Sequence, residues 1–191
     1  AHGFTTRPEG SLGPSYGFCW RNFGATFIEG VSPTGGIDQV LDNVAALAED
    51  SSDTNCVTLA WDEKLVHLAS LPPCHYAFQL VTRGAFLDCV LHQRSADMLL
   101  GVPFNVFEYA LLTRLVANTL GLRAGTLIHA IGDAHIYKDH LRAAAELLQR
   151  PVIPSPAVSI SMTLEEFMSS SDVIKIPSYV YNPAIKLPMS V

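Results

Sequence analysis

The chain has 191 residues, of which 49% are hydrophobic, so it can bury one substantial core, and we expect a single domain over residues 1–191. A formal net charge of −6 argues against a nucleic-acid partner, because proteins that bind phosphate backbones rely on clustered Lys and Arg. No apolar run approaches the roughly 20 residues that span a bilayer, and the polar start shows no secretory leader. The four cysteines show neither CxxC pairing nor zinc-ligand spacing, which predicts a reduced, cytoplasmic protein.

The first part of the sequence predicts loops that alternate with short regular elements. Residues 10–24 are rich in glycine and indicate a shaped loop that enters a strand, not a helix. The apolar residues of 37–50 fall at helical spacing, so a helix that ends near Asp50 is expected to pack one face inward. After the polar connection at 51–55, residues 56–61 have the composition of a short strand.

Two β-like runs flank Arg83 and Gly84 and predict a hairpin over residues 76–95. The motif LPPCH stands just before this hairpin, where two prolines restrict the backbone in front of Cys74. Arg94 ends the second run, so the hairpin would bring it close to the cysteine. A cysteine attacks as its thiolate, and a neighbouring arginine stabilises that anion, so this pair is a candidate nucleophile with its cation.

The middle of the sequence predicts a helix followed by a strand. From Phe104 the residues are apolar on nearly all sides, which indicates a buried central helix. Gly121 is a natural residue to end it. Residues 125–137 are then typical of a strand that leads into a loop carrying histidines.

The last part predicts one more helix and two β-like runs. The helix covers residues 139–150 and is stopped by Pro151, and the runs lie at 158–162 and 173–181. Helices and strands are mixed without a regular βαβ alternation. This arrangement favours an α+β fold built of layers.

Several motifs together carry a resemblance to a known family. GSLGPSYGFCWR, LPPCH, QRSAD, LLGVPFN and GDAHIYKDH occur in that order, and this series resembles the motif series of the thymidylate synthase family. The likeness runs from about Gly10 to Val191 and lacks the family's N-terminal region, which is missing or shortened. It implies a twisted mixed β-sheet packed by helices, and a homodimer that forms through the sheet.

The resemblance also implies a reaction. In this family a cysteine thiolate adds to C6 of a uracil ring, which makes C5 a nucleophile for the one-carbon unit of methylenetetrahydrofolate, with dihydrofolate as the co-product. Cys74 would be that cysteine, and the partners would be a pyrimidine nucleotide and a folate. Covalent addition replaces one unfavourable step by two easier ones, and the folate supplies both the carbon and the reductant.

The remaining roles follow motif by motif from the resemblance. Arg94 would face both the thiolate and the nucleotide phosphate, and Ser95 would add a hydroxyl to the phosphate. Asn105 would read the base, because its amide offers one donor and one acceptor to the O4 and N3–H edge of uracil. Four further roles are implied. Tyr16 would line the pocket near the cysteine, and His135 and Tyr137 would bind the sugar 3′-hydroxyl. Asp97 would bind the pterin and counts as both a substrate-binding and a folate-binding residue, and Ser190 and Val191 would close over the folate.

Each candidate also has an ordinary structural interpretation. A free cysteine such as Cys74 is more often a small buried hydrophobe than a nucleophile. Asn105 could cap the helix that begins near it, and Asp97 could be a solvated loop carboxylate. The histidines His129, His135 and His140 fit no pair of metal ligands, so no metal is expected. The remaining cysteines, Cys19, Cys56 and Cys89, are assigned to packing.

The departures from the family bear on the substrate. The family carries an Arg–Arg pair that reaches the phosphate of the partner subunit, and here the aligned residues are Thr54 and Asn55. Arg21 or Arg7 would have to compensate, or the phosphate is held differently. The family's N-terminal region also normally supplies a phosphate arginine, a glutamate that organises proton-transfer waters, and a tryptophan against the folate.

This pattern resembles a divergent branch, the pyrimidine-nucleotide C5-methylases and hydroxymethylases of nucleoside-antibiotic biosynthesis and of some phages. The first hypothesis is C5-methylation of UMP, dUMP or both. The alternative is a hydroxymethylase, in which water attacks the exocyclic methylene intermediate and tetrahydrofolate leaves unoxidised. A second alternative, from another class, is a catalytically weak nucleotide-binding dimer.

Overall fold

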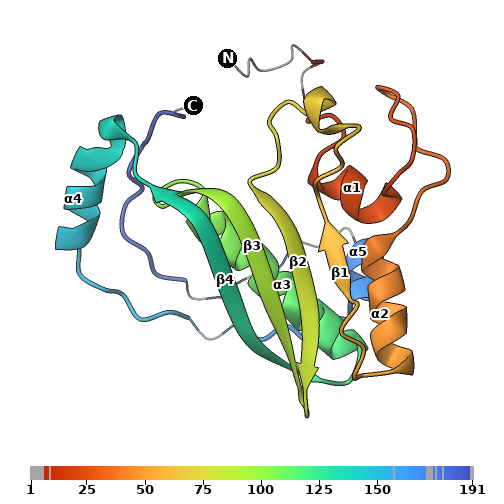
Figure 1. The fold of residues 1–191 in the computed structure, drawn as a ribbon. Helices are drawn as coiled ribbons and strands as arrows, with labels where there is room; N and C mark the ends of the chain where they lie inside the picture. The colour runs from red at the N-terminus through yellow and green to blue at the C-terminus, as the bar shows by residue number, and fades with distance from the viewer. Residues whose placement is uncertain are drawn as a thin grey trace.

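The structure is a computed structural model that describes residues 7–8, 10–156, 158–170, 174, 176–177 and 179–189. Its centre is a sheet of four strands in the order β1-β2-β3-β4 (Figure 1). Strands β1 to β3 pair antiparallel, whereas β4 runs parallel to β3, so the sheet is mixed. The strands are β1 (Val57–Leu59), β2 (His75–Arg83), β3 (Phe86–Asp97) and β4 (Arg123–His135).

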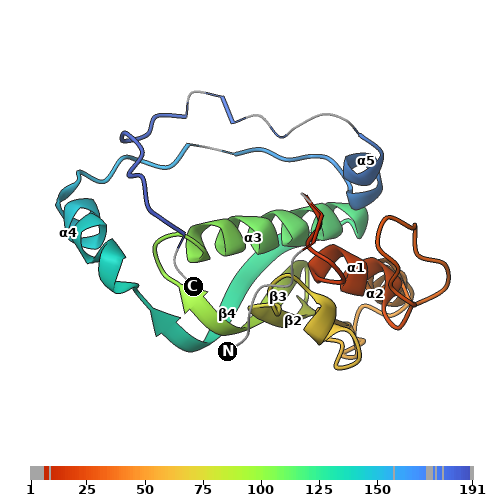
Figure 2. The same cartoon turned by 90° about the horizontal axis from the view of Figure 1, so that it is seen from above.

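Helices pack on one face of this sheet. The long helix α3 connects the parallel strands β3 and β4, as such a crossover requires, and lies along the sheet (Figure 2). Helices α1 and α2 lie beside it on the side of β1. The helices are α1 (Tyr16–Asn22), α2 (Gln39–Glu49), α3 (Val102–Thr119), α4 (Leu141–Gln149) and α5 (Leu164–Ser169), with 3-10 turns η1 (Val66–Leu68) and η2 (Lys138–His140). This layered arrangement confirms the expected α+β class.

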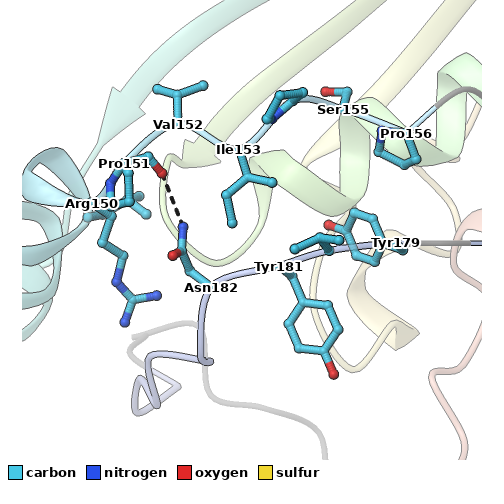
Figure 3. Close-up of a pocket in the computed structure, with 12 residues that line it drawn as sticks. Arg150, Pro151, Val152, Ile153, Ser155, Pro156, Tyr179, Tyr181 and Asn182 are labelled. Carbon is cyan, nitrogen blue, oxygen red and sulfur yellow. Dashed lines mark hydrogen bonds between the residues drawn. The ribbon is translucent and has the colours of Figure 1, made fainter.

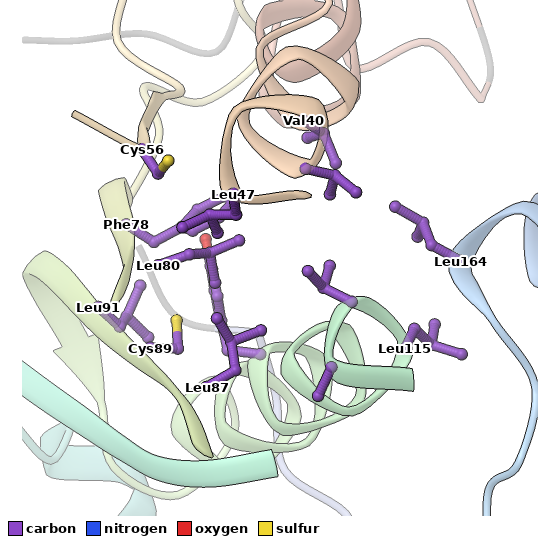
Figure 4. Packing of buried hydrophobic residues seen from close by; sticks show 14 residues of the cluster. Val40, Leu47, Cys56, Phe78, Leu80, Leu87, Cys89, Leu91, Leu115 and Leu164 are labelled. Carbon is purple, nitrogen blue, oxygen red and sulfur yellow. The ribbon is translucent and has the colours of Figure 1, made fainter. Parts of the chain in front are cut away.

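The core fills the space between the sheet and these helices (Figure 4). Leu87, Cys89 and Leu91 are fully buried at alternate positions of β3, which is the period of a strand with one face inward. Tyr109 of α3 meets Phe78 of β2 edge-on, with ring centroids 5.4 Å apart. Burying one such aromatic side chain contributes about 2–3 kcal/mol. Cys19 and Cys56 are also buried and free, which confirms their assignment to packing.

The opposite face of the sheet carries apolar side chains that point to solvent. Val57 and Leu59 flank the buried Thr58 on β1 and are 42% and 37% exposed. Tyr76 on β2 is 37% exposed and Ile128 on β4 is 47% exposed. In the part of the chain that the structure describes, the helices lie on the other side of the sheet (Figure 2).

The structure corrects the expectation for residues 10–24. Tyr16–Asn22 form helix α1 rather than a loop that enters a strand. The glycines do shape a turn, since Gly13 has φ +71°, but this turn lies before the helix. Trp20 then packs edge-on against Phe78 at 5.4 Å, so tertiary packing outweighs the local glycine signal.

The predicted strand at 158–162 is also wrong. These residues form no strand, and the side-chain amide of Asn118 donates to the carbonyls of Ile160 at 2.9 Å and Met162 at 2.8 Å. These backbone carbonyls are therefore hydrogen-bonded by a side chain and not by a neighbouring strand. Of the run at 173–181, residues 173, 175 and 178 lie outside the described residues, and the others are not in a strand.

The central helix is confirmed but is less buried at its start than expected. Helix α3 begins at Val102, and Phe104 and Phe107 are 71% and 49% exposed. Burial is complete further on, at Tyr109, Val116 and Ala117. The 76–95 hairpin, the helix ending at Asp50 and the helix stopped before Pro151 are confirmed. Among the described residues, no helix is long and apolar enough to cross a bilayer.

Candidate active site

The candidate residues gather at one end of the sheet. Cys74 immediately precedes β2, and the antiparallel pairing of β2 with β3 sets it opposite the end of β3. Strands β3 and β4 are parallel, so their ends coincide, and Asp97 pairs with His135. Ser95 pairs with Asp133 just before. Segments distant in sequence therefore meet here because of the hairpin and the crossover.

Arg94 holds the backbone that leads to Cys74. Its Nε donates to the carbonyl of Pro73 at 2.9 Å, and its Nη2 donates to that of Pro72 at 2.9 Å. Its own backbone N–H donates to the carbonyl of Cys74 at 2.8 Å. The guanidinium also lies over the ring of Trp61, 5.7 Å from its centroid. The cation and the half-buried cysteine are thus fixed beside each other.

Tyr16 supports the cysteine from helix α1. Its hydroxyl oxygen accepts from the backbone N–H of Cys74 at 2.8 Å, and its ring stacks on His75 with centroids 3.9 Å apart. Burial raises the pKa of Tyr16 to about 12, so the phenol keeps its proton at neutral pH. The helix that the sequence did not predict therefore brings this side chain to the cysteine.

His75 is buried behind Cys74 and is neutral. Burial lowers its pKa from 6.5 to about 4, and its Nδ1 lies 2.7 Å from the hydroxyl of Tyr109. Burial also raises the pKa of Tyr109, whose phenol is fully enclosed. That hydroxyl needs an acceptor, so it donates to Nδ1 and leaves the proton of the imidazole on Nε2.

A second polar chain leads to Asn105. The Nε2 of Gln93 donates to Oδ1 of Asn105 at 3.1 Å and to the carbonyl of Ser95 at 2.9 Å. The Oε1 of Gln93 lies 2.8 Å from Nε2 of His129. Burial lowers the pKa of His129, so the neutral ring donates through Nε2 and fixes the orientation of the Gln93 amide. Asn105 does not cap α3, because the N-cap is Gly101, which corrects that interpretation.

Asp97 and His135 hold the loops at the ends of their strands. The Oδ1 of Asp97 accepts from the backbone N–H groups of Leu99 at 3.0 Å and Leu100 at 3.2 Å, so it shapes the turn into α3. The Nδ1 of His135 lies 3.1 Å from Oδ2 of Asp133. Its ring meets Tyr137 edge-on at 5.0 Å. Ser190 and Val191 lie outside the described residues.

The residues at the positions of the family's arginine pair form hydrogen bonds within the chain, and so do the two arginines considered as compensation. Thr54 accepts at its carbonyl from Gln79 at 2.7 Å, and Asn55 bonds to Asp53 within the same loop. Of the two arginines considered as compensation, Arg21 pairs with Asp38 at 2.6 Å, and Arg7 pairs with Glu29. Each of these two cations is therefore paired with a carboxylate of its own.

Two hollows of the described surface are bordered by segments that follow residue 149. One of about 310 Å³ lies between residues 150–156 and 179–182, where the amide of Asn182 donates to the carbonyl of Pro151 at 3.3 Å (Figure 3). The other, of about 430 Å³, is mainly apolar and lies between α1, α3 and α5. It is lined by Trp20 and Glu108 among others. The described residues include no group of three His, Cys, Asp or Glu side chains that could hold a metal ion.

Comparison with known proteins decides the family. The family model described as thymidylate synthase matches residues 3–191. The chain belongs to the thymidylate synthase family. Within this family it is 39% identical over 198 residues to the thymidylate synthase of Ascaris suum, and 40% identical over 192 residues to that of Homo sapiens. The thymidylate synthase of human herpesvirus 8 is 40% identical over 194 residues.

These alignments cover nearly all of the chain but only part of each relative. They include 100%, 99% and 99% of the chain, and 66%, 61% and 57% of the thymidylate synthases of Ascaris suum, Homo sapiens and the herpesvirus. The sequence resemblance to the thymidylate synthase family is therefore confirmed. The chain spans less than two thirds of the human relative.

Sequence reasoning did not find Gln93, His129 or Glu108. Gln93 stands inside the QRSAD motif, so its place in the motif was a signal that could have drawn attention to it. His129 and Glu108 lie in β4 and α3, and nothing in their local sequence distinguishes them from other polar residues. Their importance comes from contacts between segments, which a single sequence does not show.

Proposed function

We propose that the chain methylates C5 of a uridylate, dUMP or UMP, with methylenetetrahydrofolate as the one-carbon donor and dihydrofolate as the co-product. The observation that carries this proposal is the meeting of Cys74, Arg94 and Asn105 at one end of the sheet. The thymidylate synthases among its relatives support it. Residues 1–191 would act as one catalytic domain.

Cys74 is the nucleophile in this mechanism. Its thiolate forms a bond to C6 of the uracil ring, and the displaced electron pair makes C5 a carbon nucleophile. Arg94 fixes the backbone before the thiol and sets a cation beside the developing charge. Tyr16 fixes the same backbone from α1. The folate supplies the carbon that C5 takes up, and the C5 proton leaves to water. The bond from this carbon to the folate then breaks, hydride from the folate reduces the carbon to a methyl group, and the bond between C6 and the sulfur breaks to free the thiolate of Cys74.

Asn105 selects the base. Its Nδ2 donates to O4 of uracil, and its Oδ1, already oriented by Gln93, accepts from N3–H. Cytosine would oppose Nδ2 with an amino group, donor against donor, and leave both buried groups unpaired. An unpaired buried polar group costs about 1–3 kcal/mol, so the pair favours uracil by roughly tenfold or more.

The remaining contacts hold the phosphate, the sugar and the folate. Ser95 donates a hydroxyl to the phosphate beside Arg94, and His135 and Tyr137 bind the sugar 3′-hydroxyl. Asp97 binds the pterin through the carboxylate that also shapes the turn into α3. The C-terminal residues Ser190 and Val191 close over the folate.

The substrate range fits the divergent C5-methylase branch of the family. Thr54 and Asn55 carry no charge where the family has its arginine pair, and Arg7 and Arg21 are each paired with a carboxylate. The site therefore holds the phosphate mainly through Arg94, which supports a nucleotide specificity that differs from that of an ordinary member. The loss of the two arginines also supports the second alternative hypothesis, a nucleotide-binding dimer of low activity.

Hydroxymethylation is the second candidate function. Phe104, one residue before Asn105, is 71% exposed, so the first turn of α3 is open to water. Water would then attack the exocyclic methylene carbon in place of hydride, and tetrahydrofolate would leave unoxidised.

We also propose that the protein forms a homodimer through the open face of its sheet. That face presents Val57, Leu59, Tyr76 and Ile128, and a second copy would remove this apolar surface from water. In the dimer the loop at 51–55 would lie near the neighbouring active site.

One experiment tests the proposed function. The protein is incubated with methylenetetrahydrofolate and either UMP, dUMP or CMP carrying tritium at C5. Tritium release, dihydrofolate absorbance and product mass are then followed. Methylation gives tritium release, dihydrofolate and a 5-methyl product from a uridylate. A hydroxymethyl product without dihydrofolate would establish the second candidate, and no tritium release from any nucleotide would overturn both.

A further inference from the structure

Glu108 is a carboxyl that the proposed mechanism has not used. It stands on α3 three residues after Asn105, and side chains at this spacing lie on the same face of a helix. Its Oε2 lies 4.0 Å from Nε2 of His75, the residue that follows Cys74. Two independent relations, along α3 and across to β2, therefore place this carboxyl at the candidate site.

The tautomer of His75 decides which group donates in its contact with Glu108. Tyr109 is enclosed, and its hydroxyl donates to Nδ1 of His75 at 2.7 Å, so the imidazole carries its proton on Nε2. That N–H is the donor that faces Glu108. A separation of 4.0 Å is longer than a hydrogen bond, but a glutamate has three rotatable side-chain bonds with which to shorten it.

The surroundings of Glu108 are mainly apolar. It lines the hollow between α1, α3 and α5, which Leu164, Phe167 and Met168 of α5 also line. Burial raises the pKa of Glu108 above the ordinary 4.5, although 42% of the side chain remains exposed and can exchange protons with water. The carboxyl is therefore both accessible and sensitive to its environment.

The other titratable groups around this pair are few and are accounted for. From α1, Tyr16 keeps its proton, and Arg21 is paired with Asp38. From α3, Tyr109 is protonated. Burial, and after it the nearby His129 of β4, lower the pKa of His75, and burial also lowers the pKa of His129. Within the pair, Glu108 is the carboxyl, and burial raises its pKa.

We propose that Glu108 is a positioning residue of the Cys74 site: its carboxylate accepts from Nε2–H of His75 and holds that imidazole between Tyr16 and Tyr109. This inference rests on the proposed function for its catalytic meaning. His75 is the backbone neighbour of Cys74 and stacks on Tyr16, which binds the Cys74 amide. The carboxylate thus sets the geometry around the nucleophile through His75, without touching the substrate.

The direct test is a nitrogen NMR titration of the protein labelled in its histidines. In the parent, His75 should show the Nε2–H tautomer, and its Nε2 shift should follow an inflection above pH 4.5 that reports Glu108. Glu108→Gln should remove this inflection. Glu49→Gln, at the exposed end of α2, should leave it in place. Tyr109→Phe removes the donor to Nδ1 and should reduce the Nε2–H population.

Two results would overturn the inference: an inflection above pH 4.5 that persists in Glu108→Gln, or a His75 that carries its proton on Nδ1. The titration needs no turnover, so it is independent of whether the proposed reaction occurs. In the tritium assay, kcat/KM of the parent should fall as pH drops through the pKa of Glu108, and Glu108→Gln should lose this acid limb. A parent that releases no tritium would overturn the proposed function, while the titration would still decide the Glu108–His75 pair.

Discussion

Gln93 donates from its Nε2 to Oδ1 of Asn105 over 3.1 Å, and this bond determines which way the Asn105 amide faces. The orientation of Gln93 is in turn fixed, because its Oε1 accepts from Nε2 of His129 at 2.8 Å. Side chains of β3 and β4 thus fix the orientation of Asn105 on α3. The preference of Asn105 for uracil therefore depends on Gln93 and His129, which do not touch the base themselves.

Gln93→Leu should weaken the choice between uracil and cytosine without removing Asn105. Leucine keeps most of the volume but cannot donate, so the Asn105 amide can turn over and offer either edge. We expect the ratio of kcat/KM for dUMP over dCMP to fall by roughly tenfold. Gln79→Leu, which loses only a bond to the 51–55 loop, serves as the control. An unchanged ratio would show that Asn105 needs no support from Gln93.

Cys74→Ser should abolish tritium release from C5. A serine hydroxyl is far less acidic than a thiol and does not add to C6 at neutral pH, so we expect a loss of at least roughly a thousandfold. Cys19→Ser is a matched control, because Cys19 points its sulfur at the carbonyl of Pro14, 3.7 Å away, where a hydroxyl can donate equally well. Activity retained in Cys74→Ser would rule out the covalent mechanism.

Arg94→Lys should fail although it keeps the positive charge. The guanidinium donates to two successive carbonyls, those of Pro72 and Pro73, and a single ammonium cannot reproduce that fork. We expect at least a roughly hundredfold loss in kcat/KM, together with weaker nucleotide binding. Arg114→Lys, on the exposed side of α3, should behave as the parent. Full activity in Arg94→Lys would mean that only the charge matters.

The sequence predicted local elements well and long-range contacts poorly. The hairpin was predictable because Gly84 lies at a turn between two β-like runs, and the closeness of Cys74 and Arg94 followed from it. Helix α1 was not predictable, because the glycines around it favour a loop, whereas Trp20 packs onto the core only in the folded chain.

The polar chains around the site escaped the sequence for the same reason. Gln93, Asn105 and His129 come from a strand, a helix and another strand, and nothing local links them. Their side chains meet only after β4 has paired with β3 through the crossover. Pairings of this kind depend on tertiary packing, which neither propensity nor periodicity encodes.

Ile128→Lys should separate the proposed dimer. Ile128 lies on the open face of β4 and is 47% exposed in the single chain, so a second copy would have to bury the introduced charge. We expect the dissociation constant measured by sedimentation to rise by at least roughly tenfold. Leu148→Lys, at a side chain 83% exposed on α4, is the control for added charge. A parent that sediments as a monomer at micromolar concentration would contradict the dimer itself.

His75 should make the stability of the fold depend on pH. Burial lowers its pKa from 6.5 to about 4, so the unfolded chain takes up a proton before the folded chain does. The stability that the neutral imidazole contributes is fully present above pH 6.5 and is lost as pH falls towards about 4. At about 1.4 kcal/mol per pKa unit this is on the order of 3 kcal/mol of unfolding free energy, measurable by urea titration across that range. His75→Gln should flatten the decline, whereas His67→Gln, at an exposed side chain, should not. If His75→Gln loses stability as steeply as the parent, another group carries the acid sensitivity.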